Sequence, residues 1–158
     1  MKEEPRATHS RIFWPYVASS AWDNSSRKVP EALKILRAAA SDSRWRVREG
    51  VAMALQRFGD TDMGVLTEME RWSRGSFLEM RAADASLCEP RLLKQAEHAK
   101  EVPIILDLIT KSISSAKNRN ADAFKALRKS MGYCWSVAVA ANPDIGRSML
   151  EQWFSTKD

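Results

Sequence analysis

Apolar residues recur at helical spacing along almost the whole chain after residue 30, with polar residues between them. In the segment 44–58 five apolar residues fall at i, i+4, i+7, i+8 and i+11 and so share one helix face: Val47, Val51, Ala54, Leu55 and Phe58. The pattern predicts six or seven helices. They are expected at about 30–40, 44–58, 77–88, 104–116 and 121–141, with another through Val65, Met69 and Trp72 and a last through Ile145, Met149 and Trp153.

Capping residues mark several of the predicted helix ends. Gly59 is the expected C-terminal cap of the helix 44–58, and Asp60 and Thr61 are N-cap candidates for the next helix. Ser76 and Glu79 have the spacing of a capping box, in which each side chain binds the backbone N–H of the other residue.

Prolines mark three further boundaries. Pro90 cannot continue the helix that ends near Cys88, and Pro103 is expected to open the helix 104–116. Asn142-Pro143 is expected to end one helix and begin the last. Residues 91–100 are polar, and their structure stays open.

An internal repeat is the strongest feature of the sequence. Each copy has an apolar residue followed by Arg, a small residue four positions after the Arg, and a larger apolar residue three positions later. In a stack of helix pairs we expect the small residue to lie where two helices cross closely, and the Arg to reach a neighbouring helix end or a carboxylate. The copies are Val47-Arg48, Ala52 and Leu55; Met80-Arg81, Ala85 and Cys88; and Leu127-Arg128, Gly132 and Trp135.

The composition agrees with a helical domain. Of the 158 residues, 44% are hydrophobic and 28% charged, while six Gly, six Pro and two Tyr leave little material for a turn-rich β architecture. We therefore predict an all-α protein, an α-α superhelix of about six to eight helices stacked as antiparallel pairs. Residues 31–158 are expected to form this repeat domain, and residues 1–30 an N-terminal segment that could cap one end of it.

Two segments carry a resemblance to known families. Residues 42–59, DSRWRVREGVAMALQRFG, resemble the second half of a HEAT repeat, with Asp42, Val47 and Arg48 at the family's Asp and Val-Arg positions. Residues 124–129 and 132–137 resemble bacterial HEAT-like proteins of the alkylation-repair DNA glycosylase superfamily. The resemblance covers roughly residues 31–155. It implies a non-catalytic scaffold that binds a protein or nucleic acid on its concave surface, or alternatively an alkylpurine DNA glycosylase or a degenerate relative that binds DNA.

Positive charge is unevenly distributed along the chain. The net charge is +5, but residues 1–59 carry 11 basic and 6 acidic side chains, residues 60–101 carry 6 and 9, and residues 102–158 carry 8 and 5. Arg48, Arg81 and Arg128 occupy equivalent repeat positions and are interpreted as struts to carboxylates such as Asp42 and Asp84.

A second interpretation of the same arginines stays open, in which they form a basic ladder with Lys129 that holds phosphates. Arg44 and Arg46 are the better candidates for direct contact with a partner.

The glycosylase alternative would need an acid and aromatic faces around a cationic base. Asp107 is the one acid inside a strongly apolar helix, and Trp45, Trp72 or Trp135 could supply a face. Asp107 can equally pair with Lys111 one turn further on, and tryptophans in a helical stack are usually core residues.

Other chemistries find little support in the sequence. Cys88 and Cys134 lie in apolar contexts without paired spacing, which predicts buried thiols, and the two histidines, His9 and His98, have no metal-ligand or triad spacing. We therefore expect no metal and no cofactor. The sequence shows no signal peptide or membrane span, so a cytoplasmic protein is expected, with a protein or nucleic-acid partner and homodimer formation left open.

Overall fold

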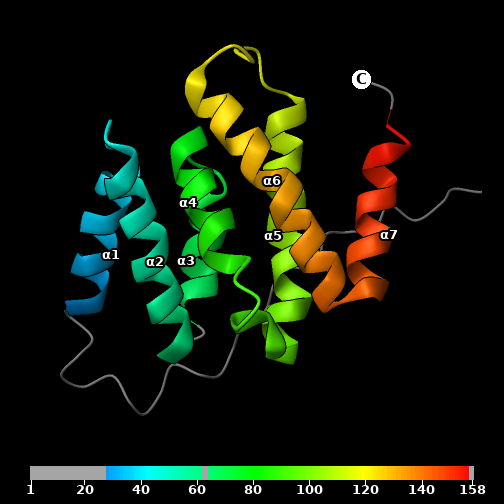
Figure 1. Ribbon diagram of the computed structural model, residues 1–158, viewed down its shortest axis with the longest axis horizontal. Coiled ribbons are helices and arrows are strands. Elements are labelled where there is room, and N and C mark those ends of the chain that lie inside the picture. The colour runs from blue at the N-terminus through cyan, green and yellow to red at the C-terminus, as the bar shows by residue number, and fades with distance from the viewer. Residues whose placement is uncertain (1–27, 62–63, 157–158) are drawn as a thin grey trace, which may run out of the picture. The chain divides into compact units, whose positions relative to one another are not determined.

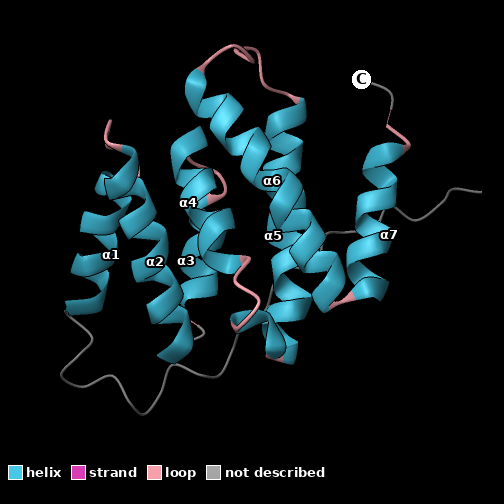
Figure 2. Ribbon diagram, in the orientation of Figure 1, coloured by secondary structure: helices cyan, strands magenta, loops and turns pink. Residues whose placement is uncertain are grey.

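The computed structural model describes residues 28–61 and 64–156, and all regular structure in these residues is helical (Figures 1 and 2). The all-α prediction is therefore confirmed for the described part of the chain. The helices are α1 Lys28–Ala39, α2 Trp45–Thr61, α3 Val65–Trp72, α4 Phe77–Leu87, the 3-10 helix η1 Leu92–Lys94, α5 Ala96–Ser114, α6 Asp122–Ala141 and α7 Pro143–Phe154.

The chain divides into two units, residues 1–34 and residues 35–158. Of the first unit, only the beginning of α1 belongs to the described residues. The predicted cap formed by residues 1–30 thus lies, apart from residues 28–30, outside the described part of the chain.

Within residues 35–158 the helices pack in two alternating rows. In one row α4 lies between α2 and α6, and in the other α5 packs against both α3 and α7. Figure 1 shows α6 passing in front of α5, and α2, α4 and α6 running in the same direction down the view. Large apolar side chains fill the space between the rows, including Leu55, Met69, Trp72, Leu87, Leu106 and Leu127.

The predicted capping signals are confirmed at two helix starts. The Ser76 hydroxyl accepts a hydrogen bond from the Glu79 backbone N–H at 3.3 Å, and the Ser76 N–H donates to the Glu79 carboxylate at 2.6 Å. The Asn142 side chain accepts a hydrogen bond from the Ile145 N–H at the start of α7, where Pro143 is the first helical residue. Local polar chemistry decides both boundaries.

The prediction that α2 stops at Gly59 is wrong. The helix runs on to Thr61, so Asp60 and Thr61 are helical rather than N-caps of α3. Gly59 is buried, and a Cβ built there would lie 3.1 Å from Cδ1 of Leu92. The glycine at position 59 is therefore explained by the close packing of η1 against α2. It does not mark the end of a helix.

The prediction that Pro103 opens a helix is also wrong. Helix α5 begins at Ala96 and carries Pro103 in its interior, where the ring is fully buried. Proline has no N–H to donate to the Ala99 carbonyl, so one helical hydrogen bond is missing there. The buried stripe runs through the proline from Ala99 to Ile109, and its packing outweighs that loss.

Candidate functional site

The three copies of the repeat fall on α2, α4 and α6, the helices of one row, with Cys88 of the second copy at the C-cap of α4. The last apolar position of each copy is buried, at Leu55, Cys88 and Trp135. The repeat spacing therefore marks equivalent inward-facing positions on three neighbouring helices, and it places the three repeat arginines at equivalent positions along them.

The interpretation of the small residue is only partly right. Ala52 is buried, but Gly132 is exposed, and a Cβ built on it would meet nothing within 4 Å. The close helix approach on α6 occurs elsewhere, at α7, where a Cβ on Gly146 would lie 2.8 Å from the Val139 Cα. Gly132 is thus no packing glycine.

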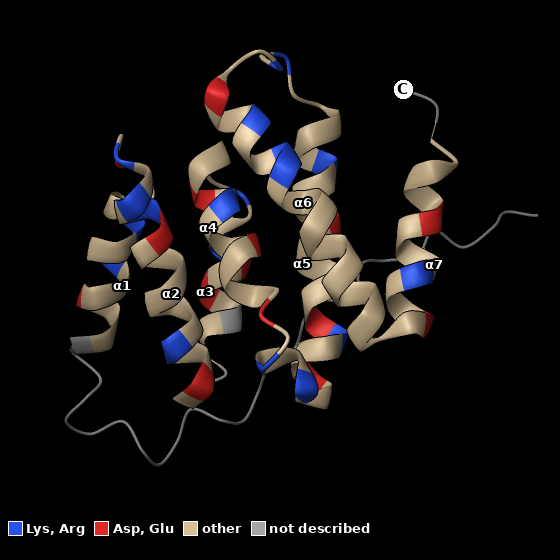
Figure 3. Cartoon of the chain, in the orientation of Figure 1, with Lys and Arg blue, Asp and Glu red and all other residues tan. Residues whose placement is uncertain are grey.

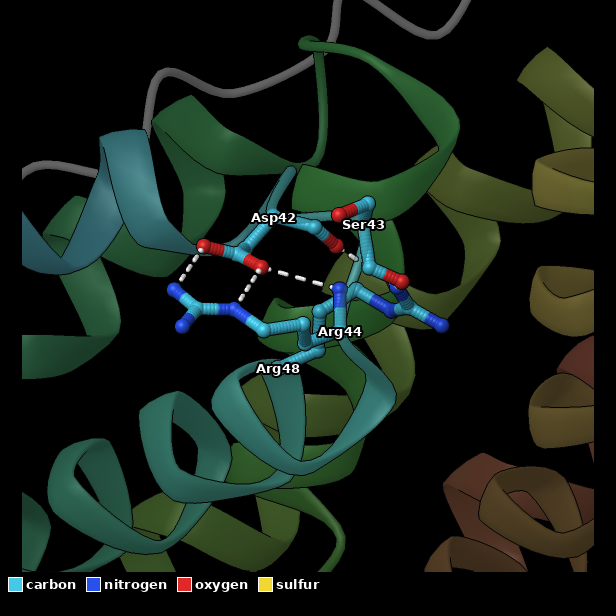
Figure 4. Close-up of polar contacts among 4 residues, drawn as sticks. All are labelled: Asp42, Ser43, Arg44 and Arg48. Carbon is cyan, nitrogen blue, oxygen red and sulfur yellow. Dashed lines mark hydrogen bonds and ion pairs between the residues drawn. The ribbon is translucent and has the colours of Figure 1, made fainter.

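Arg44 is held by an acidic side chain in the turn before α2 (Figure 4). Its Nε and Nη2 donate to the two carboxylate oxygens of Asp42 at 3.0 and 2.9 Å, and its backbone N–H donates to the same carboxylate at 2.8 Å. The hydrogen bond from the Arg44 side chain lowers the pKa of Asp42 to about 2. Arg44 therefore carries a compensated charge, which weakens its candidacy as a partner contact.

Two of the repeat arginines make the contacts expected of struts, but to other groups than predicted. Arg48 donates to the backbone carbonyls of Asp42 and Ser43 at 2.6 and 2.9 Å (Figure 4). Arg81 of α4 donates to the Glu49 carboxylate of α2 at 2.5 Å. Arg48 thus fixes the turn before α2, and Arg81 ties α2 to α4.

The third repeat arginine has no such contact. Arg128 and its neighbour Lys129 are exposed on α6, and neither has an ion-pair or hydrogen-bond partner among the described residues. Lys125, one turn earlier, lies 3.8 Å from the exposed Asp122 carboxylate. The first half of α6 consequently presents three cations to solvent.

The candidate tryptophans differ sharply in exposure. Trp45 is 60% exposed, and the Arg46 guanidinium lies 5.4 Å from its ring centroid. Trp72 and Trp135 are buried, and their indole N–H groups donate to Glu68 and to the Thr110 hydroxyl, each at 3.0 Å. Only Trp45 of the three offers an accessible aromatic face.

Two further exposed residues were missed by the sequence reasoning. Met53 of α2 is 57% exposed and Tyr133 of α6 is 62% exposed. The available signal was their position opposite the buried stripe: Met53 lies seven residues after Arg46 on one side of α2, and Tyr133 lies four after Lys129 on α6.

These side chains define what we call the outer face of the α2, α4 and α6 row. Figure 3 shows basic residues along α2, α4 and the first half of α6, with acidic residues on the same helices. Acidic groups on this face are largely engaged with neighbouring cations, as Glu49 is with Arg81. The outer face comprises Trp45, Arg46, Met53 and Arg57 of α2, Arg81 of α4, and Lys125, Arg128, Lys129 and Tyr133 of α6.

Asp107, the acid named for the glycosylase alternative, is engaged on both oxygens. Lys111 lies 2.7 Å from one oxygen, and the Trp153 indole of α7 donates to the other at 3.0 Å. The side chain is only 17% exposed. The group ties α5 to α7.

Asp84, which was expected to pair with a repeat arginine, is a buried acid between α4 and α6, and Arg81 makes its ion pair with Glu49. The Ser130 hydroxyl donates to Oδ1 of Asp84 at 2.9 Å, while its Oδ2 has no hydrogen-bond partner among the described residues. Burial raises the pKa of Asp84 to about 8. The carboxyl therefore stays largely protonated at neutral pH.

Both cysteine thiols are free and buried, as predicted. The Cys134 thiol donates to the Asp84 carbonyl at 3.5 Å. Burial, followed by the nearby Cys134 and Asp84, raises the pKa of the Cys88 thiol. Cys88 is thus held in the un-ionised, weakly reactive form.

His98 is fully buried in α5, and neither ring nitrogen has a hydrogen-bond partner in the described part of the chain. Burial lowers its pKa, so the neutral ring is favoured. No group of three or more His, Cys, Asp or Glu side chains in residues 28–61 and 64–156 is arranged to hold a metal ion. Over the same residues, the helices are too short or too polar to cross a membrane.

Comparison of the chain with protein-family models, with curated proteins and with solved structures found no match.

Proposed function

We propose that the chain is a non-catalytic HEAT-like scaffold that binds a macromolecular partner through the outer face of the α2, α4 and α6 row. The observation that carries the proposal is the exposure of Trp45, Met53 and Tyr133 on this face, each more than half accessible. Large apolar and aromatic side chains grouped with cations on one side of a molecule are typical of interaction surfaces.

The packing of the described helices supports the HEAT-like part of the proposal. Three equivalent copies of one sequence pattern lie on three neighbouring helices of a row, and each helix of the row also packs against helices of the other row. Repeat proteins stack their units in this way and use one extended face for binding. Arg48 and Arg81 contribute by fixing a turn and an interhelical contact.

The glycosylase alternative receives less support, and we do not propose it. Its best candidate acid, Asp107, is paired with Lys111 and bound by Trp153, so it is not directed at a substrate base. Two of its three candidate aromatic residues, Trp72 and Trp135, are buried with their indole N–H groups bonded inside the protein.

A retention experiment with matched surface variants tests the proposal. The tagged protein, the variant Trp45→Ala/Tyr133→Ala and the control Lys100→Ala are each incubated with cell extract. Bound proteins are identified by mass spectrometry and bound nucleic acids by sequencing. Lys100 is exposed on α5, in the other row. We expect a specific component that the wild type and the control retain and the double variant loses. Equal retention by all three proteins would refute the proposed face.

A further inference from the structure

The outer face combines aromatic side chains and uncompensated cations, which together match one class of polyanion. On α2, Trp45 has a free ring surface and Arg46 against it, and no acidic partner of Arg46 or Arg57 is present among the described residues. On α6, Tyr133 follows Lys129 by one helical turn, and Arg128 adds a further cation. Each end of the face therefore pairs an exposed ring with cations.

The width of the face limits which nucleic acid it can take. Packed helices lie about 8–10 Å apart, so α2 and α6, with α4 between them, are separated by about 20 Å. The major groove of B-form DNA is about 12 Å wide and admits one helix, so a layer of three side-by-side helices cannot enter it. Base pairs inside a duplex also hide their faces from protruding aromatic rings, whereas unpaired bases expose them.

We propose that the outer face binds single-stranded nucleic acid, with unpaired bases stacked on Trp45 and Tyr133 and the backbone phosphates held by Arg46, Arg57, Arg128 and Lys129. This inference rests on the proposed binding function and names its partner class. The exposed rings favour nucleic acid over an acidic polypeptide, because stacking on a flat ring is available to every nucleobase but to few acidic peptides. Arg44 and Arg81 add little, since each is already paired with a carboxylate.

The cations and the aromatic rings should affect binding in two separately measurable ways. The cations should set the salt dependence of the affinity, and the rings should change the affinity without changing that dependence. Four phosphate contacts on a single strand predict a slope of about −3 in a plot of log affinity against log salt concentration. Removing one cation with Lys129→Ala reduces the steepness of the slope by about 0.7. Removing one ring with Trp45→Ala or Tyr133→Ala weakens binding by about five- to a hundred-fold and leaves the slope unchanged.

Fluorescence anisotropy of a labelled 20-mer of deoxythymidine, titrated with the full chain between low and physiological salt, measures both signatures. Parallel titrations use a 20-base-pair duplex and labelled polyglutamate, and Lys100→Ala is the control variant. All substituted residues are exposed, and circular dichroism of each variant verifies its helical content. We expect the single strand to bind most tightly, the ring variants to lose affinity, and the control to behave as the wild type.

Several results would overturn the inference. Equal binding of the duplex or of polyglutamate, unchanged affinity in both ring variants, or absence of binding at low salt would each do so. These failures remain distinguishable from failure of the proposed function, because the retention experiment is blind to the class of partner. A protein retained by the wild type and lost in the double variant would preserve the binding face while refuting its assignment to single strands.

Discussion

The buried carboxyl of Asp84 makes the stability of the protein depend on pH. It lies between α4 and α6, fully inaccessible, with Ser130 as its side-chain hydrogen-bond donor and one oxygen without a partner in the described residues. Ionisation would leave a charge in an apolar interface, where desolvation is expensive. The substitution Asp84→Asn removes ionisation while keeping an oxygen that can accept the Ser130 hydrogen bond.

The sign and size of the effect follow from the two pKa values of this group. Its pKa is about 8 in the folded protein against 3.8 for an unperturbed aspartate. Between these values the folded state keeps a proton that the unfolded state has released. The contribution of Asp84 to the free energy of unfolding is therefore greatest below about pH 4 and falls as pH rises towards 8, by about 1.4 kcal/mol per pH unit. At pH 7, about three units above 3.8, the accumulated loss is about 4 kcal/mol.

Urea unfolding followed by circular dichroism at pH 6.0, 6.5, 7.0 and 7.5 measures this slope. We expect the wild-type free energy of unfolding to decrease over the series, and the Asp84→Asn variant to show a decrease smaller by about 1.4 kcal/mol per pH unit. Asp122→Asn, which changes an exposed acid on α6, is the control and should follow the wild type. Parallel pH profiles for the wild type and Asp84→Asn would refute the assignment of a raised pKa to Asp84.

Four further substitutions test the packing and capping described above. Gly146→Ala should lower the free energy of unfolding by about 1–3 kcal/mol, because the new Cβ would lie 2.8 Å from the Val139 Cα. Gly132→Ala should raise it by about 0.5–1 kcal/mol, because no atom lies within 4 Å of the new Cβ and alanine is the better helix former. Thermal melts that ranked the two variants in the opposite order would contradict this. Ser76→Ala should cost about 1 kcal/mol through loss of the capping box, and no change in urea midpoint would contradict that. Burial lowers the pKa of His98, so below about pH 6.5 the unfolded state binds a proton that the folded state does not. The free energy of unfolding therefore falls as pH drops through this range. The substitution His98→Leu should remove this loss, as measured by urea unfolding at pH 7 and pH 5.

Sequence patterns predicted those helix boundaries that local chemistry decides. The Ser76 capping box and the Asn142-Pro143 junction involve residues within three positions of each other, so their spacing is visible in the chain. Gly59 and Pro103 were misassigned because tertiary packing overrides their local preferences. The Leu92 side chain packs closely against Gly59, and the ring of Pro103 is buried within a continuous apolar stripe.

The candidate site could be predicted only in part, for a related reason. The repeat correctly placed equivalent residues on α2, α4 and α6, but it could not identify the partner of each charge. Arg81 binds Glu49, 32 residues away, and Asp84 accepts from Ser130, 46 residues away. Such pairings depend on which helices become neighbours, and no short-range pattern specifies them. The exposure of Tyr133 likewise depends on the side of α6 that the fold leaves open.

Site-specific photocrosslinking in cells tests the outer face as a binding surface most directly. A photoreactive benzoylphenylalanine is placed at Tyr133, an aromatic position that is already 62% exposed, and in a separate protein at Lys100 on α5. The account predicts a discrete crosslinked adduct from the Tyr133 position and none from the Lys100 position. Adducts formed equally at both positions, or only at Lys100, would contradict the assignment of binding to this face.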